Sequence, residues 1–291
     1  MKKTIRLALA AILTLGIAGC SSGSAAATSE APAADAAEDK VITVGVNPVP
    51  HSEIMENAVK AALAEEGWEL NVVVFEDYVL PNTSLEEGEL DANYFQTLGY
   101  MKDQNESRGL HLVAVAGVHI EPMGLYSEKY TDYKDIPDGA SIAVPNDTDN
   151  ESRALDLLIA KGLLNNPEGR TNEYVADTDF NGNDATNPHG YNIVLIEAAS
   201  LPINLPDVDA AVINGNYALG ADLPAKHPAL FIEEFDEETA VRRTNFLVVK
   251  EGSENSDKIA ALIKATQSET VQKFIDDTYK GAVITSFVEA E

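Results

Sequence analysis

Apolar positions along the chain follow two spacings, continuous runs and one-sided helical patterns, and these alternate from residue 41 onward. VITVGVN at 41–47 is a continuous apolar run and predicts a buried strand. The segment at 51–67 carries its apolar residues on one helical face and ends at Gly67. ELNVVVFED at 69–77 predicts a second strand. A strand–helix–strand unit of this kind predicts a parallel sheet with a right-handed crossover.

The same alternation continues to the C-terminus and predicts the α/β class. A change of sheet is predicted near HIEPMGLYSEKY (119–130) and a return near HPALFIEEFD (227–236), so strands from both halves of the chain serve two sheets. Ligands of open α/β sheets bind beyond the carboxyl ends of strands, which makes the segments after strands the most informative. We expect further strands at 110–117, 140–145, 191–197, 209–214 and 245–250, and helices at 94–108, 151–162 and 258–279.

The first forty residues do not follow this pattern. Three basic residues precede an apolar run that is too short to span a membrane, which is typical of a signal peptide at 1–19. Cys20, the one cysteine of the chain, directly follows this run and resembles the lipidated cysteine of a bacterial lipobox rather than an idle thiol. Residues 20–40 are rich in Ala, Ser and Pro and predict a flexible tether. We therefore expect a lipid-anchored protein on the extracytoplasmic face of the cell membrane, either periplasmic or at the cell surface.

Acidic residues dominate the charge of the chain. The formal net charge is −28, and without the three basic residues of the signal peptide 17 Lys and Arg remain against 48 Asp and Glu, which gives −31. A surface of this charge repels phosphates and excludes nucleic acid as a partner. Because Cys20 is the only cysteine, disulfides and thiolate chemistry are excluded as well.

Signatures of catalysis and of metal binding are weak. A G-x-S-x-G match at 19–23 overlaps the lipobox and cannot form a nucleophile elbow. DTDFNGND at 177–184 matches the first half of a calcium loop, but Pro188 stands where the bidentate glutamate belongs, so a surface loop is favoured and calcium binding stays open. We expect no catalytic residue, no metal and no cofactor. The five histidines, which lack zinc-ligand spacing, are His51, His111, His119, His189 and His227.

Two polar residues follow strands at positions suited to ligand contacts. Val144–Pro145 ends a strand, and Asp149 or Asn150 is expected to cap the next helix, which places Arg153 in its first turn. Free backbone N–H groups and a guanidinium at one point suit a carboxylate, and pairing of the arginine with a surface acid is an equal alternative. Asn214 can accept from an ammonium or donate to a carboxylate, but without further support a tight Asn-Gly turn is the preferred interpretation.

Aromatic residues gather in one polar stretch, FEDYVLPNTSLEEGELDANYFQTLGY at 75–100. Acidic residues and amides separate the rings, in a stretch that is too polar to be core throughout. Burial in the core is the favoured interpretation for any single ring, but the cluster as a whole needs more context. Its members are Phe75, Tyr78, Tyr94, Phe95 and Tyr100.

Four long segments in register resemble the methionine-binding lipoproteins of the NlpA/MetQ type, which are substrate-binding components of ABC importers. They are the aromatic stretch extended to Gln104, HIEPMGLYSEKY, AVPNDTDNESRAL and DAAVINGNYAL, and the resemblance covers the chain from about Val41 to its C-terminus. It implies a two-lobed periplasmic-binding-protein fold with the ligand cleft between the lobes. With the predicted changes of sheet, lobe 1 is expected at 41–125 plus 230–291 and lobe 2 at 126–229.

The resemblance also implies an aromatic wall around a methionine side chain. Tyr78, Phe95 and Tyr100 match the family's wall residues. A thioether sulfur gains polarizable contacts at ring edges, which explains why aromatic rings suit this ligand. Thr97 stands where some members carry a histidine, a departure that bears on ligand preference.

Three polar positions complete the implied site. Arg153 matches the arginine that holds the ligand carboxylate, and Asn214 matches a pocket asparagine. Asn187 falls where the family places a second ligand-contacting asparagine, in a divergent neighbourhood. Ile203 replaces an arginine of many relatives, outside these motifs.

The function implied by the resemblance is the capture of methionine for an ABC permease and its ATPase. L-methionine is the expected ligand, and D-methionine stays open as a second one. We expect a non-catalytic monomer that contacts the membrane through its lipid. The same fold binding a methionine-containing dipeptide or another small amino acid is the alternative. A surface lipoprotein with no transport role is a further alternative.

Overall fold

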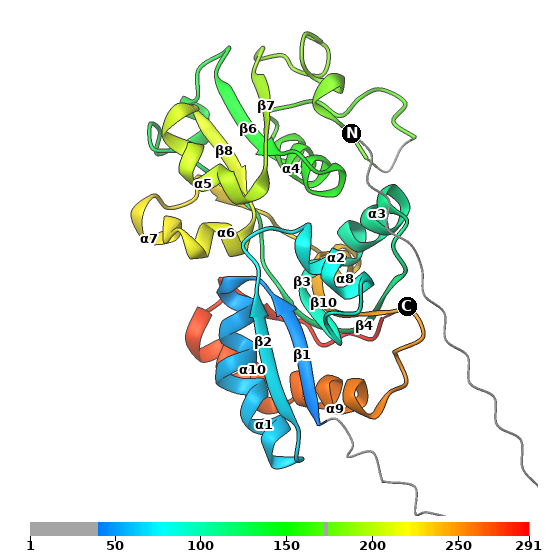
Figure 1. Ribbon diagram of the computed structural model, residues 1–291. Coiled ribbons are helices and arrows are strands. Elements are labelled where there is room, and N and C mark those ends of the chain that lie inside the picture. Colours follow the sequence, from blue (N-terminus) through cyan, green and yellow to red (C-terminus); the bar gives the residue numbers. More distant parts are fainter. Residues whose placement is uncertain (1–39, 172–173, 291) are drawn as a thin grey trace, which may run out of the picture. The chain divides into compact units, whose positions relative to one another are not determined.

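Figure 1 shows the computed structural model, which describes residues 40–171 and 174–290. Within these residues, two β-sheets and the helices that cover them belong to one compact unit. The α/β class predicted from the alternating pattern is confirmed. The predicted signal peptide at 1–19, the lipidation site Cys20 and the tether up to residue 39 lie outside the described residues.

The first sheet combines parallel and antiparallel pairs in the order β11-β4-β10-β3-β1-β2. β1 pairs in parallel with both β2 and β3, as the predicted strand–helix–strand unit requires. β10, late in the chain, pairs antiparallel with β3 on one side and β4 on the other. The strands are β1 (Val41–Val46), β2 (Glu69–Val74), β3 (Ala92–Thr97), β4 (Leu112–Ile120), β10 (Thr244–Lys250) and β11 (Ile284–Thr285).

The second sheet has the order β7-β6-β8-β5-β9. β6 pairs in parallel with β7 and β8, and β5 pairs antiparallel with β8 and β9. Its strands are β5 (Gly124–Tyr126), β6 (Ser141–Pro145), β7 (Asn192–Ile196), β8 (Ala210–Ile213) and β9 (Phe231–Ile232).

The chain passes between the sheets twice, once between β4 and β5 and once between β9 and β10. The lobe boundaries expected at 125 and 230 stay a prediction. The lobe 1 drawn from them includes most of β5 and all of β9, whereas both strands pair within the second sheet. This pairing favours lobe boundaries within the two passages themselves, at 121–123 and at 233–243.

Helices bury the apolar faces that the sequence predicts. In the first core, Ile54, Met55, Val59 and Leu63 pack beneath β1 against two C-terminal helices, which lie beside α1 in Figure 1. The elements concerned are η1 (Pro48–Ser52), η2 (Met55–Val59), α1 (Lys60–Glu65), α9 (Asp257–Thr266) and α10 (Glu269–Tyr279). The remaining helices are α2 (Leu80–Glu86), α3 (Leu98–Arg108), α4 (Thr148–Ala160), α5 (Leu201–Asn204), α6 (Gly215–Gly220), α7 (Leu223–Lys226) and α8 (Glu237–Arg243), with short η3 (Tyr133–Asp135), η4 (Asp177–Asp179), η5 (Ala198–Ser200) and η6 (Leu205–Asp207).

One predicted helix begins later than expected. The helix expected at 94–108 starts only at Leu98, because β3 continues to Thr97. All six residues of β3 are buried, and the strand hydrogen-bonds to β1 and β10 on its two sides. Pairing with strands distant in sequence therefore overrides the local helical spacing at Tyr94–Thr97.

In the part of the chain that the structure describes, no helix combines the length and the apolarity that crossing a membrane requires.

The first core generates a stability prediction. Leu262 of α9 is fully buried, and truncation to alanine leaves a cavity that costs about 2–5 kcal/mol. We expect Leu262→Ala to lower the free energy of unfolding by that amount in chemical denaturation. Ile203→Ala is the control, because Ile203 is 79% exposed and its truncation removes little packing. Equal effects of the two substitutions would contradict this account of the core.

Candidate functional site

One cavity brings together residues that follow strands of both sheets. Tyr78, Phe95, Tyr100, Arg153 and Asn214, five of the six ligand contacts expected from the resemblance, line it. The other lining residues are Gln96, Thr97, Glu121, Asn150, Gly215, Asn216 and Asn245.

Three aromatic rings form one wall of the cavity. Phe95 comes from β3, Tyr100 from the first turn of α3 and Tyr78 from the segment after β2. The ring centroid of Tyr78 lies 5.7 Å from that of Phe95 and 5.6 Å from that of Tyr100. The Tyr100 hydroxyl also donates a hydrogen bond to the Tyr78 carbonyl at 3.1 Å. These separations are typical of interacting aromatic pairs, so the wall is held together before any ligand enters.

The other two aromatic residues of the stretch at 75–100 belong to the core. Tyr94 precedes Phe95 in β3, so its side chain leaves the opposite face of the sheet, where it is fully buried. Phe75 packs against an apolar cluster that contains Leu85 and Phe246. The concentration of rings therefore has two causes, core packing for these two and the cavity wall for the other three.

Hydrogen bonds and ring contacts join the two sides of the cavity. The Tyr78 hydroxyl donates to Asn216 Oδ1 at 2.6 Å, and the Tyr217 hydroxyl donates to the Glu76 carbonyl at 3.1 Å. The Tyr78 and Tyr217 ring centroids are 4.9 Å apart. Because Asn216 and Tyr217 lie in α6, directly after β8, these contacts link the second sheet to the segment after β2 of the first.

Arg153 lies at the cavity wall with only 5% of its side chain exposed. Its Nε donates to Glu233 Oε1 at 3.0 Å, and its Nη2 donates to Glu233 Oε2 at 2.5 Å and to the Glu121 carbonyl at 2.9 Å. The sequence left two roles open for Arg153, pairing with an acid and contacting a ligand. The structure shows the pairing with an acid and also places the arginine in the lining of the cavity. Its Nη1 forms no hydrogen bond with the residues that the structure describes, which leaves this nitrogen for a ligand.

The start of α4 differs from the expectation. Asp147 caps the helix, with its carboxylate accepting from the Asn150 N–H at 3.0 Å, whereas Asp149 or Asn150 is the cap that the sequence predicts. Asp147 is the last residue with an extended backbone, and its side chain reaches the third N–H of the helix from there. Arg153 is therefore the sixth helical residue and lies in the second turn of α4.

Glu233, which sequence reasoning missed, balances the charge of Arg153. Burial alone would raise the pKa of Glu233, but Arg153, and after it Arg243, outweighs burial and holds that pKa below its ordinary value. Arg243 Nε donates to Glu233 Oε1 at 3.1 Å. Glu233 also accepts from the Met123 N–H at 3.2 Å, so its carboxylate contacts the first passage between the sheets as well as the second, to which it belongs.

Amide side chains supply further polar groups. Asn214 Nδ2 donates to Asn150 Oδ1 at 2.8 Å, and Asn150 in turn donates to the Asp147 carboxylate at 2.9 Å. Asn214 precedes α6 but its side chain makes no capping bond. Its Oδ1 is buried without a hydrogen-bond partner among the described residues. Because an unpaired buried acceptor is costly, this oxygen is available to a donor on a ligand.

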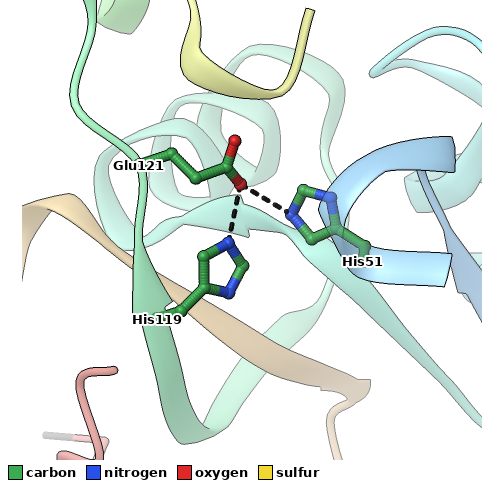
Figure 2. Close-up of side chains that lie close together, drawn as sticks. All are labelled: His51, His119 and Glu121. Carbon is green, nitrogen blue, oxygen red and sulfur yellow. Dashed lines mark hydrogen bonds and ion pairs between the residues drawn. The ribbon is translucent and has the colours of Figure 1, made fainter. Parts of the chain in front are cut away.

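Glu121 is a second residue that sequence reasoning missed. It directly follows β4, in a segment that was interpreted as a change of sheet and as part of the family resemblance, without a role for this residue. Figure 2 shows one of its carboxylate oxygens between two imidazole rings: Oε1 lies 2.7 Å from His119 Nε2 and 3.3 Å from His51 Nε2. The other oxygen, Oε2, is buried without a partner among the described residues. Its position at the end of a strand was the signal that could have identified it.

The fold also gathers two histidines that the sequence leaves scattered. The rings of His51 and His119 lie 5.1 Å apart, and both side chains are buried. Burial lowers the pKa of His51 to about 4 and that of His119 to about 3. Burial also raises the pKa of Glu121 to about 7, against the opposing effects of His51 and Arg153. Both imidazoles are therefore neutral near pH 7, where Glu121 titrates.

Asn187 does not line the cavity. Its Nδ2 donates to the Tyr191 carbonyl at 2.7 Å, and its Oδ1 accepts from the Tyr191 N–H at 2.9 Å. The side chain is 3% exposed and holds the turn before β7. Its expected contact with a ligand stays a prediction that this geometry does not support.

The Asp-rich loop at 177–184 uses its oxygens to hold its own backbone. Asp179 Oδ2 accepts from the Ala176 N–H at 2.9 Å, and Asn181 Oδ1 accepts from the Ile193 N–H at 3.0 Å. Asn183 Oδ1 accepts from the Ala185 N–H at 3.2 Å. This geometry agrees with the favoured interpretation of a structured surface loop.

Comparison with known proteins shows one family over nearly all of the described residues. Residues 42–287 match the NlpA lipoprotein family. The chain belongs to this family. Membrane lipoprotein TpN32 of Treponema pallidum is 36% identical over 249 residues, which cover 85% of this chain and 88% of that protein. Methionine-binding lipoprotein MetQ of Bacillus subtilis is 32% identical over 293 residues, which cover 98% of each.

A solved structure extends the relationship to three dimensions. The nutrient binding protein of Burkholderia cenocepacia, solved bound to methionine, matches this NlpA-family chain with a TM-score of 0.78 at 38% identity, over 84% of this chain and 100% of that one. The resemblance stated from the sequence and the two-lobed fold that it implied are confirmed. NlpA-family proteins bind substrates without catalysis, so this chain is a binding protein and not an enzyme.

The buried ion pair of this NlpA-family chain generates a stability prediction. Glu233→Ala leaves Arg153 buried beside the cavity without its carboxylate partner, which costs about 3–5 kcal/mol of the free energy of unfolding. Glu234→Ala is the matched control, because that neighbour is 83% exposed and its pair with Lys161 is worth little. Chemical denaturation at neutral pH measures both.

The same pair predicts a pH dependence. The pKa of Glu233 is lower in the folded chain than in the unfolded one, so its stabilisation is present above the unfolded pKa and is lost as pH falls through the folded pKa. Stability of the parent protein should therefore fall more steeply on acidification than that of Glu233→Ala. Parallel pH profiles of the two proteins would contradict the pairing.

Proposed function

We propose that this chain captures methionine outside the cytoplasm and delivers it to the permease of an ABC importer. Its membership in a family of substrate-binding lipoproteins supports this, as do a relative named for methionine binding and a structural relative solved with methionine. The cavity between the two sheets is the binding site in this proposal. Different lining residues recognise the carboxylate, the ammonium and the side chain of methionine.

The observation that carries the proposal is that one cavity is lined by a guanidinium and by two buried acceptors without partners among the described residues. Arg153 presents Nη1 of its guanidinium, and two acceptors, Glu121 Oε2 and Asn214 Oδ1, are buried without partners among the described residues. An α-amino acid carries a carboxylate and an ammonium, and both lose hydration on entering a closed site. A guanidinium for the carboxylate and buried acceptors for the ammonium replace that hydration.

The aromatic wall selects the side chain. Tyr78, Phe95 and Tyr100 surround an apolar part of the cavity, and ring edges attract a thioether sulfur. A charged or strongly polar side chain would lose its hydration there without receiving hydrogen bonds in return. Methionine fits this environment better than a polar amino acid does.

The polar partners left in the cavity bear on the alternative ligand. Its lining holds one guanidinium and two acceptors without partners among the described residues, which match one carboxylate and one ammonium. This favours one amino acid over a methionine-containing dipeptide, whose additional peptide group requires further polar partners. Native mass spectrometry of the purified chain, followed by titration calorimetry with L-methionine, D-methionine and glycyl-methionine, tests the choice.

Arg153→Ala should nearly abolish methionine binding. Removing one partner of a buried charge pair costs about 3–5 kcal/mol, or a few hundred- to a few thousand-fold in dissociation constant. Arg153→Lys should recover only part of the affinity, because a point charge cannot reproduce the planar fork that also holds Glu233 and the Glu121 carbonyl. Titration calorimetry on ligand-stripped protein measures both variants.

Circular dichroism controls for folding, since alanine also removes the partner of Glu233. The lysine variant keeps a charge beside Glu233 and so separates lost binding from lost stability. If folded Arg153→Ala binds methionine within a factor of about five of the parent, equal to roughly 1 kcal/mol, the carboxylate role is wrong.

Cys20→Ser should release the protein from the membrane. The lipid is the anchor proposed for this chain, and without it a soluble binding domain has no strong membrane affinity. Membrane fractionation measures the location, and mass spectrometry of the parent protein checks for lipid on Cys20. Ser22→Ala, two residues further on, is the control and should stay in the membrane fraction. A Cys20→Ser protein that remains in membranes of cells lacking the permease contradicts the proposal.

A further inference from the structure

We propose that His119 is a positioning residue that holds Glu121 as the ammonium-binding carboxylate of the cavity, so that entry of a methionine zwitterion expels a proton from this carboxyl group. The inference rests on the proposed function. It assigns a role to a histidine that the sequence pattern left among five scattered ones.

The hydrogen-bond directions follow from the acceptor at the centre of the cluster. An ionised carboxylate only accepts, so His119 Nε2, 2.7 Å from Glu121 Oε1, carries the proton of its ring. His119 Nδ1 is then an acceptor, and the Tyr94 hydroxyl donates to it. His51 Nε2 likewise faces acceptors only, Glu121 Oε1 at 3.3 Å and Asn245 Oδ1 at 3.2 Å. His119 therefore donates to Oε1 of Glu121, whereas the His51 N–H donates to Asn245 Oδ1 and packs beside the same carboxylate oxygen.

The hydrogen bond from His119 orients Oε2 of Glu121 without neutralising the carboxylate. Both imidazoles are neutral near pH 7, so His119 donates a hydrogen bond to Glu121 and neither ring brings a positive charge. Figure 2 shows Oε2 directed away from both rings. A Cβ added to Gly215 would lie 2.7 Å from Glu121 Cβ and 3.3 Å from Oε2, so only a glycine lets the carboxylate approach the segment after β8.

The charge near Glu121 is incompletely compensated while the cavity holds no ligand. Arg153 is the nearby cation that favours the ionised form, but its Nε and Nη2 are engaged by Glu233. The titratable groups that face Glu121 from the surrounding elements are His51 of η1, His119 of β4, Tyr94 of β3, Arg153 of α4, Tyr279 of α10 and Tyr78 before α2. The tyrosines are neutral at physiological pH because burial raises their pKa values.

A ligand ammonium changes this balance. In the free protein, burial raises the pKa of Glu121 to about 7, so the carboxyl is partly protonated near neutral pH. An ammonium beside Oε2 favours the ionised form and lowers that pKa, and the proton leaves to solvent. Affinity is thus full above the free-protein pKa and falls as pH drops below it, by about tenfold per unit.

Calorimetry tests the proton directly. Methionine is titrated into the purified mature chain in two buffers of different ionisation enthalpy, because the difference in heat gives the number of protons exchanged. We expect release of close to one proton at about pH 6 and of almost none at about pH 8.5. Glu121→Gln should bind more weakly, release none through this group and lose the corresponding pH dependence. Equal proton release by parent and Glu121→Gln overturns the proposal.

Proton release must be compared between the parent and Glu121→Gln, because other acidic residues lie near the cavity. Burial also raises the pKa of Asp147 to about 6, and Asp147 is present in both proteins. N-acetyl-methionine, which lacks the ammonium, should bind weakly and release no proton from Glu121. Tight binding with the same proton release overturns the proposal as well.

Two histidine variants test positioning. His119→Phe removes a donor to Oε1, so the pH at which affinity is lost should move upward, with binding largely restored at about pH 8.5. His119→Gln, whose amide can take the place of Nε2, should keep a midpoint close to that of the parent. His111→Phe is the control, since His111 lies at the entry to β4 with 63% of its side chain exposed. A loss in His119→Phe that is equal at every pH indicates structural damage and overturns the positioning role.

The outcomes separate the two proposals. Methionine binding without proton release overturns the role of Glu121 and leaves the proposed function standing. Absence of methionine binding at any pH in the parent, with a different ligand found by native mass spectrometry, overturns the proposed function and this inference with it.

Discussion

The ion pair between Arg153 and Glu233 is the interaction on which the arrangement of the site depends. Arg153 extends from α4 and bonds to both passages of the chain between the sheets: to the Glu121 carbonyl in the first and to the Glu233 carboxylate in the second. Glu233 returns a contact to the first passage through the Met123 N–H. A buried guanidinium is costly without such partners. The fold is therefore stable only when the two connecting segments and α4 meet at one point.

The cavity beside this pair is lined by a cation that already has partners and by acceptors that lack them. Arg153 is charged and anchored, whereas the acceptors facing the cavity, Glu121 Oε2 and Asn214 Oδ1, have no partners in the described part of the chain. Their hydrogen-bonding capacity is preorganised by neighbours, the His119 imidazole for Glu121 and Asn150 for Asn214. In the proposed function, a zwitterion supplies the charges that this arrangement lacks, and the aromatic wall excludes water from the remainder of the ligand.

Contacts between the two sides of the cavity explain how a site assembled from distant segments stays ordered. Tyr78 serves both as a wall residue and as a donor to Asn216, and Thr97 donates to Asp149 at 3.3 Å. Asp149 lies so close to Gly99 that a Cβ there would be 2.1 Å from its Oδ1. Small residues and hydroxyl groups at the ends of strands therefore allow the sides to approach, and the approach brings their polar groups within bonding distance.

The sequence by itself determined the α/β class, most strands and the family, because hydrophobic periodicity and long motifs are properties of neighbouring residues. It also named Tyr78, Phe95, Tyr100, Arg153 and Asn214, which do meet in one cavity. Only the tertiary structure decided the extent of β3, which distant strands pair on both sides, and placed Asn187 in a turn rather than at the cavity. It alone revealed the partners Glu233 and Glu121 and the histidines beside Glu121, since charge compensation and burial depend on which residues meet in space. Sequence spacing does not encode those encounters, because only the fold brings His51, which follows β1, beside His119 and Glu121 at the end of β4.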